Sequence, residues 1–264
     1  MSYYFIAGFS IGLYVLSSGL IVRHFTQKTT QHVPLYLACL AVVGHLLYIV
    51  LGCVAQQGFS FSFVATCSFV SMIVALLLLL AAITKPVAKL GVAVFPIAAL
   101  MLSLTMSFDD TAQPMPVYHW TMASHILTSI IAFSLLNIAA LQAALLAFQD
   151  QQLKSHPPKR FVHALPSLQA MEALLFEMLA AGLFFLTLSL VSGFIFLEDV
   201  FAQHLVHKTL LSLLAWFIFA GLLLGRKCYG WRGTLAIQWT VFGFFLLLLG
   251  YFGSKFVLKL ILHR

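Results

Sequence analysis

The chain has 264 residues, of which 62% are hydrophobic and only 8% are charged. So few charges cannot cover the surface of a soluble domain of this size, which excludes a soluble globular protein. The net charge of +7 comes from basic residues scattered between apolar runs, and this pattern favours a role in membrane orientation over nucleic-acid binding.

Apolar runs long enough to cross a bilayer recur along the whole chain. A hydrocarbon core of about 30 Å needs about 20 apolar residues per helix. By this measure eight spans are predicted, at 3–22, 34–54, 63–83, 90–107, 120–147, 170–196, 207–225 and 236–259. No connector is long enough for a soluble domain. We therefore expect an all-α polytopic membrane protein with about eight transmembrane helices, forming a single transmembrane domain over 1–264.

The basic residues alternate between connectors. Ten of the fourteen Lys and Arg residues fall in the first, third, fifth and seventh connectors. Connectors rich in Lys and Arg stay in the cytoplasm. This distribution therefore predicts that both termini lie outside, on the non-cytoplasmic side of the membrane. The first apolar run has no basic segment before it, so no cleaved signal peptide is expected.

Few residues in the sequence suggest enzymatic chemistry. The four cysteines, Cys39, Cys53, Cys67 and Cys228, form neither a CxxC motif nor a metal-ligand spacing, which argues against disulfide and thiol-redox chemistry. The sequence contains no nucleotide-binding loop, nucleophile elbow, zinc-protease motif or paired carboxylates. We therefore expect that the protein is not an enzyme.

Four histidines fall within predicted spans or at their outer ends. His45 lies about 16 Å into the second span, near the bilayer centre, and His125 lies about 8 Å from the outer end of the fifth. His207 opens the seventh span and His263 follows the eighth, both at the outer face. A polar side chain in lipid needs partners, so a functional role is favoured over a structural hydrogen bond for His45 and His125.

The surroundings of these histidines bear on the ligand that they bind. Imidazole ligates haem iron, zinc and copper, and it also relays protons. Zinc and proton sites usually contain carboxylates, but the acids of the predicted spans, Glu172 and Glu177, lie toward the cytoplasmic side and far from His125 and His263. Histidines surrounded by Phe, Leu, Met and Trp suit a porphyrin better than a hydrated ion.

Several motifs follow one another in the C-terminal half. L-T-xxxx-S-G ends at Gly193, L-A-W at Trp216, G-W-R-G at Gly233 and Y-F-G at Gly253. With the helix around His125, this order resembles the CcsA/CcmC cytochrome c assembly superfamily from about residue 119 to 264. The eight-span form, with a histidine in the second span, is most similar to the YpjD/HemX-like branch of that superfamily.

The resemblance implies haem handling at the outer face of the bacterial inner membrane. Members of the superfamily hold haem between two histidines that flank a tryptophan-rich outer segment, and His125 and His263 match these two positions. The resemblance thus implies a non-covalent b-type haem with His125 and His263 as axial ligands of the iron. His207 is the reserve ligand, and His45 is a further candidate for the cofactor site.

The chain departs from the family pattern in two places. The outer loop 197–206 has no tryptophan, and only Lys208 and Thr209 match the usual segment. We therefore expect that this protein alone does not attach haem to an apocytochrome. Gly225 stands about where CcsA-type members carry an intramembrane histidine, so the sequence offers no partner for His45.

The expected function is that of a haem-binding inner-membrane protein in haem trafficking or cytochrome c assembly. Its expected partners are haem, the lipid bilayer and other membrane proteins of cytochrome assembly, with no nucleic acid. Two alternatives stay open. One is a regulatory membrane partner that affects tetrapyrrole synthesis or another transporter, and the other is a metal or proton transporter that uses His45.

Overall fold

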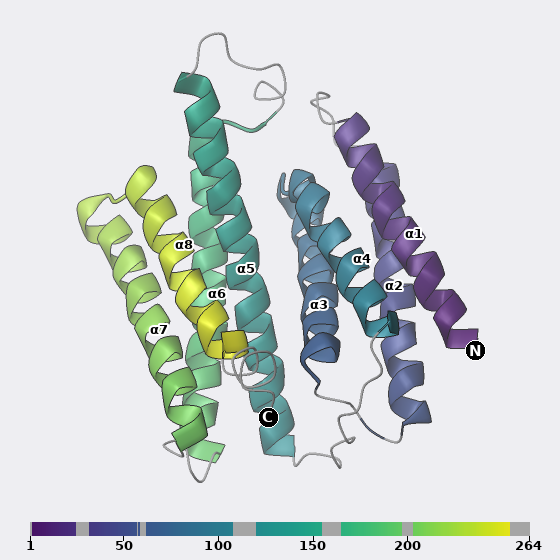
Figure 1. The fold of residues 1–264 in the computed structure, drawn as a ribbon. Coiled ribbons are helices and arrows are strands. Elements are labelled where there is room, and N and C mark those ends of the chain that lie inside the picture. Colours follow the sequence, from purple (N-terminus) through teal and green to yellow (C-terminus); the bar gives the residue numbers. More distant parts are fainter. Residues whose placement is uncertain are drawn as a thin grey trace. The chain divides into compact units, whose positions relative to one another are not determined.

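Eight α-helices make up most of the described chain (Figure 1). The computed structural model describes residues 2–24, 32–56, 58, 62–107, 120–154, 165–196 and 203–253. The helices are α1 (Ser2–Arg23), α2 (His32–Ala55), α3 (Phe63–Thr84), α4 (Gly91–Ser107), α5 (Trp120–Lys154), α6 (Leu168–Phe196), α7 (Gln203–Tyr229) and α8 (Thr234–Leu248). A 3-10 turn, η1 (Ala88–Leu90), precedes α4, and a π-helical turn, η3 (Leu249–Gly253), continues α8.

The predicted fold class is confirmed. Eight helical segments are long and apolar enough to cross a membrane, and the described residues contain no strand. α5 continues past the predicted limit of 147 to Lys154, because hydropathy marks the edge of the bilayer and not the end of the helix. An ion pair between Asp150 and Lys154, 2.6 Å long and at i,i+4 spacing, supports this last turn. The end of the eighth predicted span, 254–259, lies outside the described residues.

The helices group into two compact units. The first unit contains α1–α4, and the second contains α5–α8. Helices that follow one another in the sequence pack together within each unit, as short connections favour. The single transmembrane domain expected over 1–264 stays a prediction.

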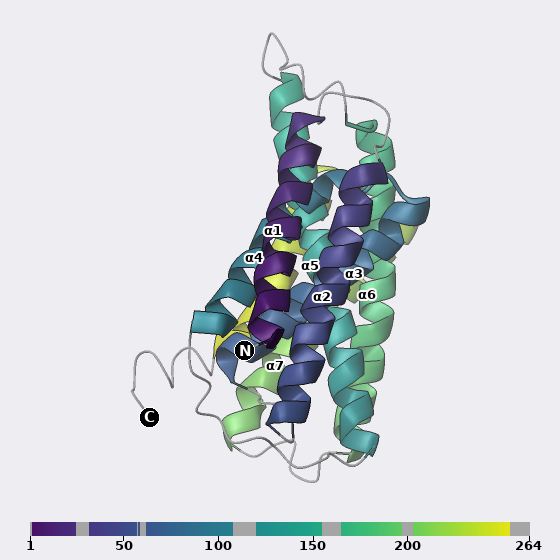
Figure 2. The same cartoon turned by 90° about the vertical axis from the view of Figure 1, so that its right-hand side faces the viewer.

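In the first unit α1 packs against both α2 and α4 (Figure 2). Small residues bring these helices close together. A Cβ on Gly44 of α2 would overlap the Ser10 side chain of α1, and a Cβ on Gly91 would lie 2.5 Å from the Phe95 ring and 2.9 Å from Ile21. Van der Waals packing between closely approaching backbones is the main attraction between helices in lipid, where apolar side chains gain little by leaving the bilayer.

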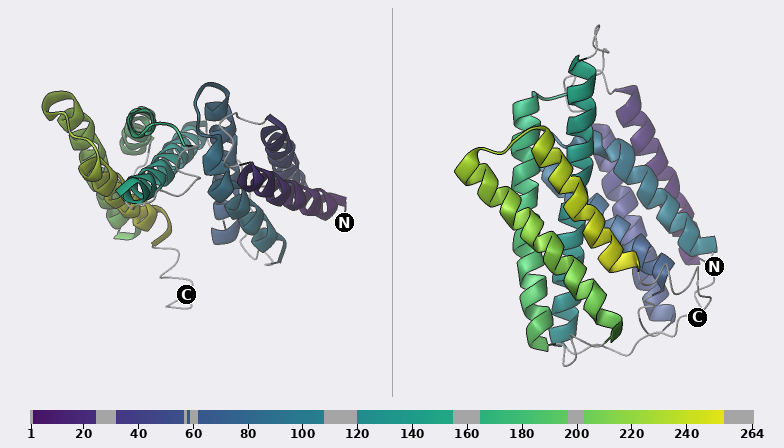
Figure 3. Two further views of the ribbon diagram at one scale, coloured as in Figure 1. Left: turned by 90° about the horizontal axis from the view of Figure 1, so that it is seen from above. Right: turned by 60° about the vertical axis from the view of Figure 1, so that its left-hand side comes forward.

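In the second unit α5 packs along α6, and α8 lies beside both α5 and α7 (Figure 3). Glycine again permits close contact. A Cβ on Gly182 of α6 would lie 2.7 Å from Leu136 of α5, and a Cβ on Gly243 of α8 would lie 2.8 Å from Phe219 of α7. The pairs α5–α6 and α7–α8 are therefore each held at a distance that a larger residue would increase.

The G-W-R-G motif forms the turn between α7 and α8. Gly230 and Gly233 have φ values of 68° and 64°, which L-residues with a side chain rarely adopt. Gly230 donates its N–H to the carbonyl of Arg226 over 3.2 Å and so ends α7. The Trp231 ring folds back onto α7, where a Cβ on Gly225 would overlap it. The position expected for a second intramembrane histidine therefore accommodates an indole ring in this protein.

Candidate functional site

His125 makes its contacts across the interface between α5 and α6. It lies about 8 Å along α5 from Trp120 and is half-buried. Its Nδ1 is 3.0 Å from the backbone carbonyl oxygen of Ser189 and 3.0 Å from the Oγ of Ser192. Ser189 and Ser192 are three residues apart on α6, so both face the same neighbouring helix.

These contacts determine which nitrogen of the imidazole carries the proton. A carbonyl oxygen only accepts hydrogen bonds, so the contact with Ser189 requires a proton on Nδ1 of His125. The Ser192 hydroxyl donates to the same carbonyl over 3.0 Å, which leaves its oxygen free to accept from Nδ1. In the neutral ring, Nε2 is then unprotonated and keeps its lone pair. No hydrogen-bond partner of Nε2 is found among the described residues.

Serine hydroxyls extend this polar contact one turn further into the helix pair. Ser129 donates to the carbonyl of His125 over 2.7 Å, and its Oγ lies 2.5 Å from the Oγ of Ser189. Both serines are buried, with exposed fractions of 8% and 5%. Because each buried hydroxyl has a partner, the polar groups stabilise the helix pair where an unpaired group would destabilise it.

The described end of α8 lies against the same region of α5. The Tyr251 side chain lies close to Ser129, one helical turn from His125. The ring of Phe133 lies 4.9 Å from that of Tyr251 and 5.6 Å from that of Phe252, measured between centroids. The Y-F-G motif forms most of the π-helical turn η3 and places it beside the helix that carries His125.

Trp216 of the L-A-W motif makes its polar contact with α6. Trp216 donates its indole N–H over 2.8 Å to Thr187, whose hydroxyl in turn donates to the Leu183 carbonyl. The Trp216 ring is thus attached to α6. The side chain of Phe196 lies outside the described residues.

His45 lies in the first unit and is fully buried. Its Nε2 is 2.9 Å from the Oγ of Ser68 on α3, and its Nδ1 is 3.5 Å from the hydroxyl of Tyr14 on α1. The Tyr14 and His45 rings meet edge to face, with centroids 6.1 Å apart. Both ring nitrogens therefore face a hydroxyl group, and the imidazole joins three helices.

The structure places only two of the four predicted site histidines in full. His207 lies in α7 next to Lys208, but its side chain is outside the described set, and His263 is outside the described residues altogether. In the described part of the chain, no group of three or more His, Cys, Asp or Glu side chains could hold a metal ion. A haem iron needs only one or two protein ligands, so this finding leaves the haem hypothesis open.

Sequence reasoning missed Ser129, Ser189 and Ser192 as contributors to the site. A weak signal was present, since the serines of α6 belong to the L-T-xxxx-S-G motif, and Ser129 follows His125 at helical spacing. Such spacing shows that residues share a helix face, but it does not show which face of a neighbouring helix they meet.

Comparison with known proteins places these features in a family. Over 140 residues the chain is 37% identical to "Inner membrane protein YpjD" of Escherichia coli strain K12, which covers 53% of each chain. It is 32% identical over 140 residues to the "Uncharacterized 28.8 kDa protein in nifR3-like 5'region" of Azospirillum brasilense, which covers 52% of each. The match thus spans about half the length of these relatives, and no solved structure matches the chain at a significant level. The family model described as cytochrome C assembly protein matches residues 10–262, across both units, and the chain therefore belongs to the cytochrome c assembly protein family.

Proposed function

We propose that this chain is a haem-binding protein of the bacterial inner membrane that works in haem trafficking or cytochrome c assembly. Membership of the cytochrome c assembly family supports haem handling, and one relative is named as an inner membrane protein. The observation that carries the proposal is the hydrogen bond from Nδ1 of His125 to the Ser189 carbonyl. Histidines that ligate metals commonly donate their other ring N–H in this way, which fixes the tautomer and raises the basicity of the ligating nitrogen.

In this proposal Nε2 of His125 is one axial ligand of a non-covalently bound b-type haem, and His263 is the other. The bound haem supplies a redox-active iron, and the two imidazoles fix its position. The contact of Tyr251 with Ser129 brings the end of η3 close to His125. From Gly253 an extended chain can span about 33 Å to His263, which is ample reach for a ligand that folds back over the helices.

His207 is the reserve ligand. Gly250 of η3 lies against α7, with its built Cβ 3.4 Å from Leu211 and 3.6 Å from the carbonyl oxygen of Lys208. The helix that carries His207 therefore begins near the end of α8. This arrangement supports His207 as the second axial ligand if His263 does not reach the iron.

His45 suits a structural role better than ligation or transport. Both of its nitrogens face hydroxyl groups within the first unit, so binding an ion there would break at least one hydrogen bond. No observation in the described residues favours the regulatory alternative. The haem hypothesis is therefore the one that the site supports best.

The wider role follows from the same residues. The protein would bind and hand over haem without covalent chemistry of its own, in contact with other membrane proteins of cytochrome assembly. The distribution of Lys and Arg supports a multi-pass orientation with both termini outside. The site would then lie toward the outer face of a single transmembrane domain.

The test is a haem titration of the purified protein followed by absorption spectroscopy. We expect a Soret band with one haem per chain, and a loss of affinity of more than roughly 100-fold in His125→Ala, because losing only a hydrogen-bonding partner of a ligand costs about 10- to 100-fold. The control is His32→Ala, which removes an exposed histidine at the start of α2. If the wild-type protein binds no haem, or if the two variants bind it equally well, the proposal is wrong. A colourless complex with another membrane protein would favour the regulatory alternative.

A further inference from the structure

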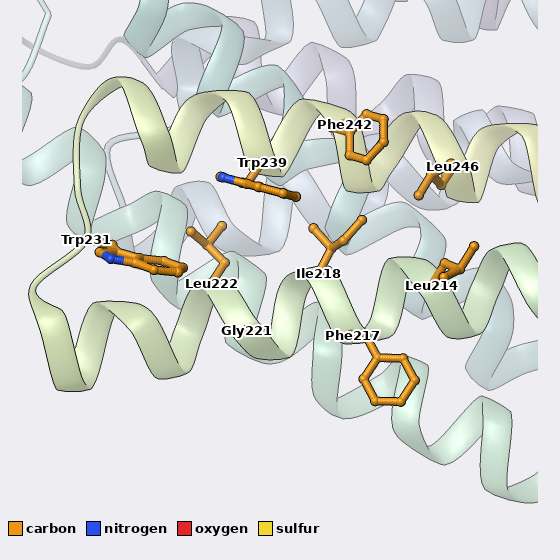
Figure 4. A pocket seen from close by; sticks show the side chains of 9 residues that line it. All are labelled: Leu214, Phe217, Ile218, Gly221, Leu222, Trp231, Trp239, Phe242 and Leu246. Carbon is orange, nitrogen blue, oxygen red and sulfur yellow. The ribbon is translucent and has the colours of Figure 1, made fainter.

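A groove with apolar walls lies between α7 and α8 (Figure 4). Its volume is about 500 Å³, within the range of small-molecule sites. α7 contributes Phe217 and Leu222, α8 contributes Trp239 and Phe242, and the connecting turn contributes Trp231. Except for the two indole N–H groups, these side chains offer no polar atom, so an occupant of the groove must be apolar.

The groove has room because α7 carries a glycine where it could carry a larger residue. A Cβ built on Gly221 meets no atom within 4 Å. By contrast, a Cβ on Gly243 of the facing helix would lie 2.8 Å from Phe219. Gly243 is therefore needed for the contact between the helices, whereas Gly221 leaves open space that the chain itself does not fill.

The length of the groove matches one leaflet of a bilayer. Its lining residues run from Leu214 to Leu222 on α7 and from Trp239 to Leu246 on α8, about 10 to 12 Å along each helix. One leaflet contributes about 15 Å to the hydrocarbon core. A partner helix would need an apolar surface through both leaflets, about 30 Å, so the dimensions favour a lipid chain.

The end of the groove at Trp231 is basic. Lys227, in the last turn of α7, and Arg232, next to Trp231, are both exposed. Arg226 differs from them because it is already paired with Glu172. Tryptophan is enriched at the level of lipid headgroups, and basic pockets between transmembrane helices bind anionic headgroups. The positive charges of Lys227 and Arg232 therefore suit an anionic headgroup, in which the phosphate is not neutralised by a cation of the same lipid.

We propose that the α7–α8 groove binds one anionic phospholipid. An acyl chain lies along the groove between Phe217 and Phe242, and the headgroup lies beside Lys227 and Arg232. This site is independent of haem binding, because its lining residues do not include His125 or the residues that contact it.

The experiment is native mass spectrometry of the full-length protein mixed with phosphatidylglycerol or phosphatidylcholine. We expect one tightly retained lipid, with phosphatidylglycerol preferred. In Gly221→Leu, which fills the groove, that lipid should be lost. In Lys227→Gln/Arg232→Gln, the preference for phosphatidylglycerol should fall roughly tenfold.

Matched controls separate the site from general effects on the membrane surface. Gly12→Leu places leucine at an exposed glycine of α1 that also has no atom within 4 Å of its built Cβ. Arg23→Gln/Lys154→Gln removes the same charge from the ends of two other helices. Both controls should retain the lipid as the wild type does.

A second measurement uses the wild-type protein, so it does not depend on whether the variants fold. Phosphatidylglycerol brominated in its acyl chains should quench the tryptophan fluorescence of the protein, to which Trp231 and Trp239 contribute, more strongly than brominated phosphatidylcholine at the same molar ratio. Equal quenching by the two lipids, equal retention of both, or wild-type retention in a folded Gly221→Leu variant would overturn the proposal. Recovery of a second polypeptide in place of the lipid would also overturn it.

Discussion

The backbone carbonyl oxygen of Ser189 lies 3.0 Å from Nδ1 of His125, so α6 determines which ring nitrogen of a histidine on α5 carries its proton. The acceptor belongs to the backbone, so no side-chain substitution at 189 removes it directly. Ser192 can be tested by mutation instead, because its hydroxyl contacts both the Ser189 carbonyl and the His125 imidazole.

Ser192→Ala should weaken haem binding without abolishing it. The substitution removes one of two contacts that orient the His125 ring, while the carbonyl still holds the proton on Nδ1. Loss of such an orienting partner typically costs about 10- to 100-fold in metal affinity, and we expect an effect at the lower end. A haem titration gives the affinity, and the Soret position should stay close to that of the wild type because the ligand is unchanged.

Ser103→Ala is a suitable control for this prediction. The Ser103 hydroxyl donates to the carbonyl of Leu100 over 2.8 Å, three residues earlier, as the Ser192 hydroxyl does to Ser189. It has no histidine beside it among the bonds described. Equal losses of affinity in the two variants would show that the effect comes from helix stability and not from the orientation of His125.

The spans could be predicted from the sequence because bilayer thickness fixes their length, and the order of motifs was enough to indicate the family. The contact of His125 with α6 could not be predicted in the same way. It depends on how α5 and α6 are rotated about their axes, and the small residue Gly182 fixes their separation only once Leu136 is known to oppose it. Likewise, G-W-R-G indicated a turn, but not that Trp231 covers Gly225.

His45→Leu should destabilise the protein and leave haem binding unchanged. The substitution removes the partner of Ser68 and of Tyr14 in a buried site, which should lower the free energy of unfolding by about 2 to 4 kcal/mol. Thermal unfolding in detergent measures the change. Loss of haem from a variant of wild-type stability would contradict the structural role.

A compensated variant sharpens this test. Tyr14→Phe/His45→Leu/Ser68→Ala removes all three polar groups of this contact, so none of them is left buried without its partner. Replacing all partners by apolar groups can leave the free energy of unfolding nearly unchanged. Most of the lost stability should therefore return. A triple variant less stable than His45→Leu alone would show that the polar contacts do not explain the role of His45.

Both termini should lie on the outer, non-cytoplasmic side of the membrane. Ten of the fourteen Lys and Arg residues fall in alternate connectors, and connectors rich in these residues stay in the cytoplasm. In a variant without native cysteines, an impermeant thiol reagent added to intact cells should label Asp110→Cys and spare Lys154→Cys. Equal labelling of the two positions would rule out the orientation.

The protein alone should not form a thioether bond between haem and an apocytochrome. The loop 197–206 contains no tryptophan, whereas the family resemblance implies a tryptophan-rich segment there, and the four cysteines form no CxxC motif. Reconstitution of the protein with haem and an apocytochrome c, followed by a denaturing gel stained for haem, measures covalent attachment directly. Efficient attachment above the level without the protein would show that this loop is not needed for it.

The last prediction concerns the second axial ligand. If His125 and His263 hold one iron between them, each variant, His125→Ala and His263→Ala, should lose the spectrum of six-coordinate low-spin haem, because bis-imidazole ligation needs both rings. His207→Ala should keep that spectrum if His207 is only the reserve ligand. In His263→Ala, added free imidazole should restore the low-spin signal by occupying the vacant axial position. A low-spin spectrum that survives His263→Ala but disappears in His207→Ala would assign the second ligand to α7, beside the end of α8, and would show that the chain after Gly253 does not complete the site.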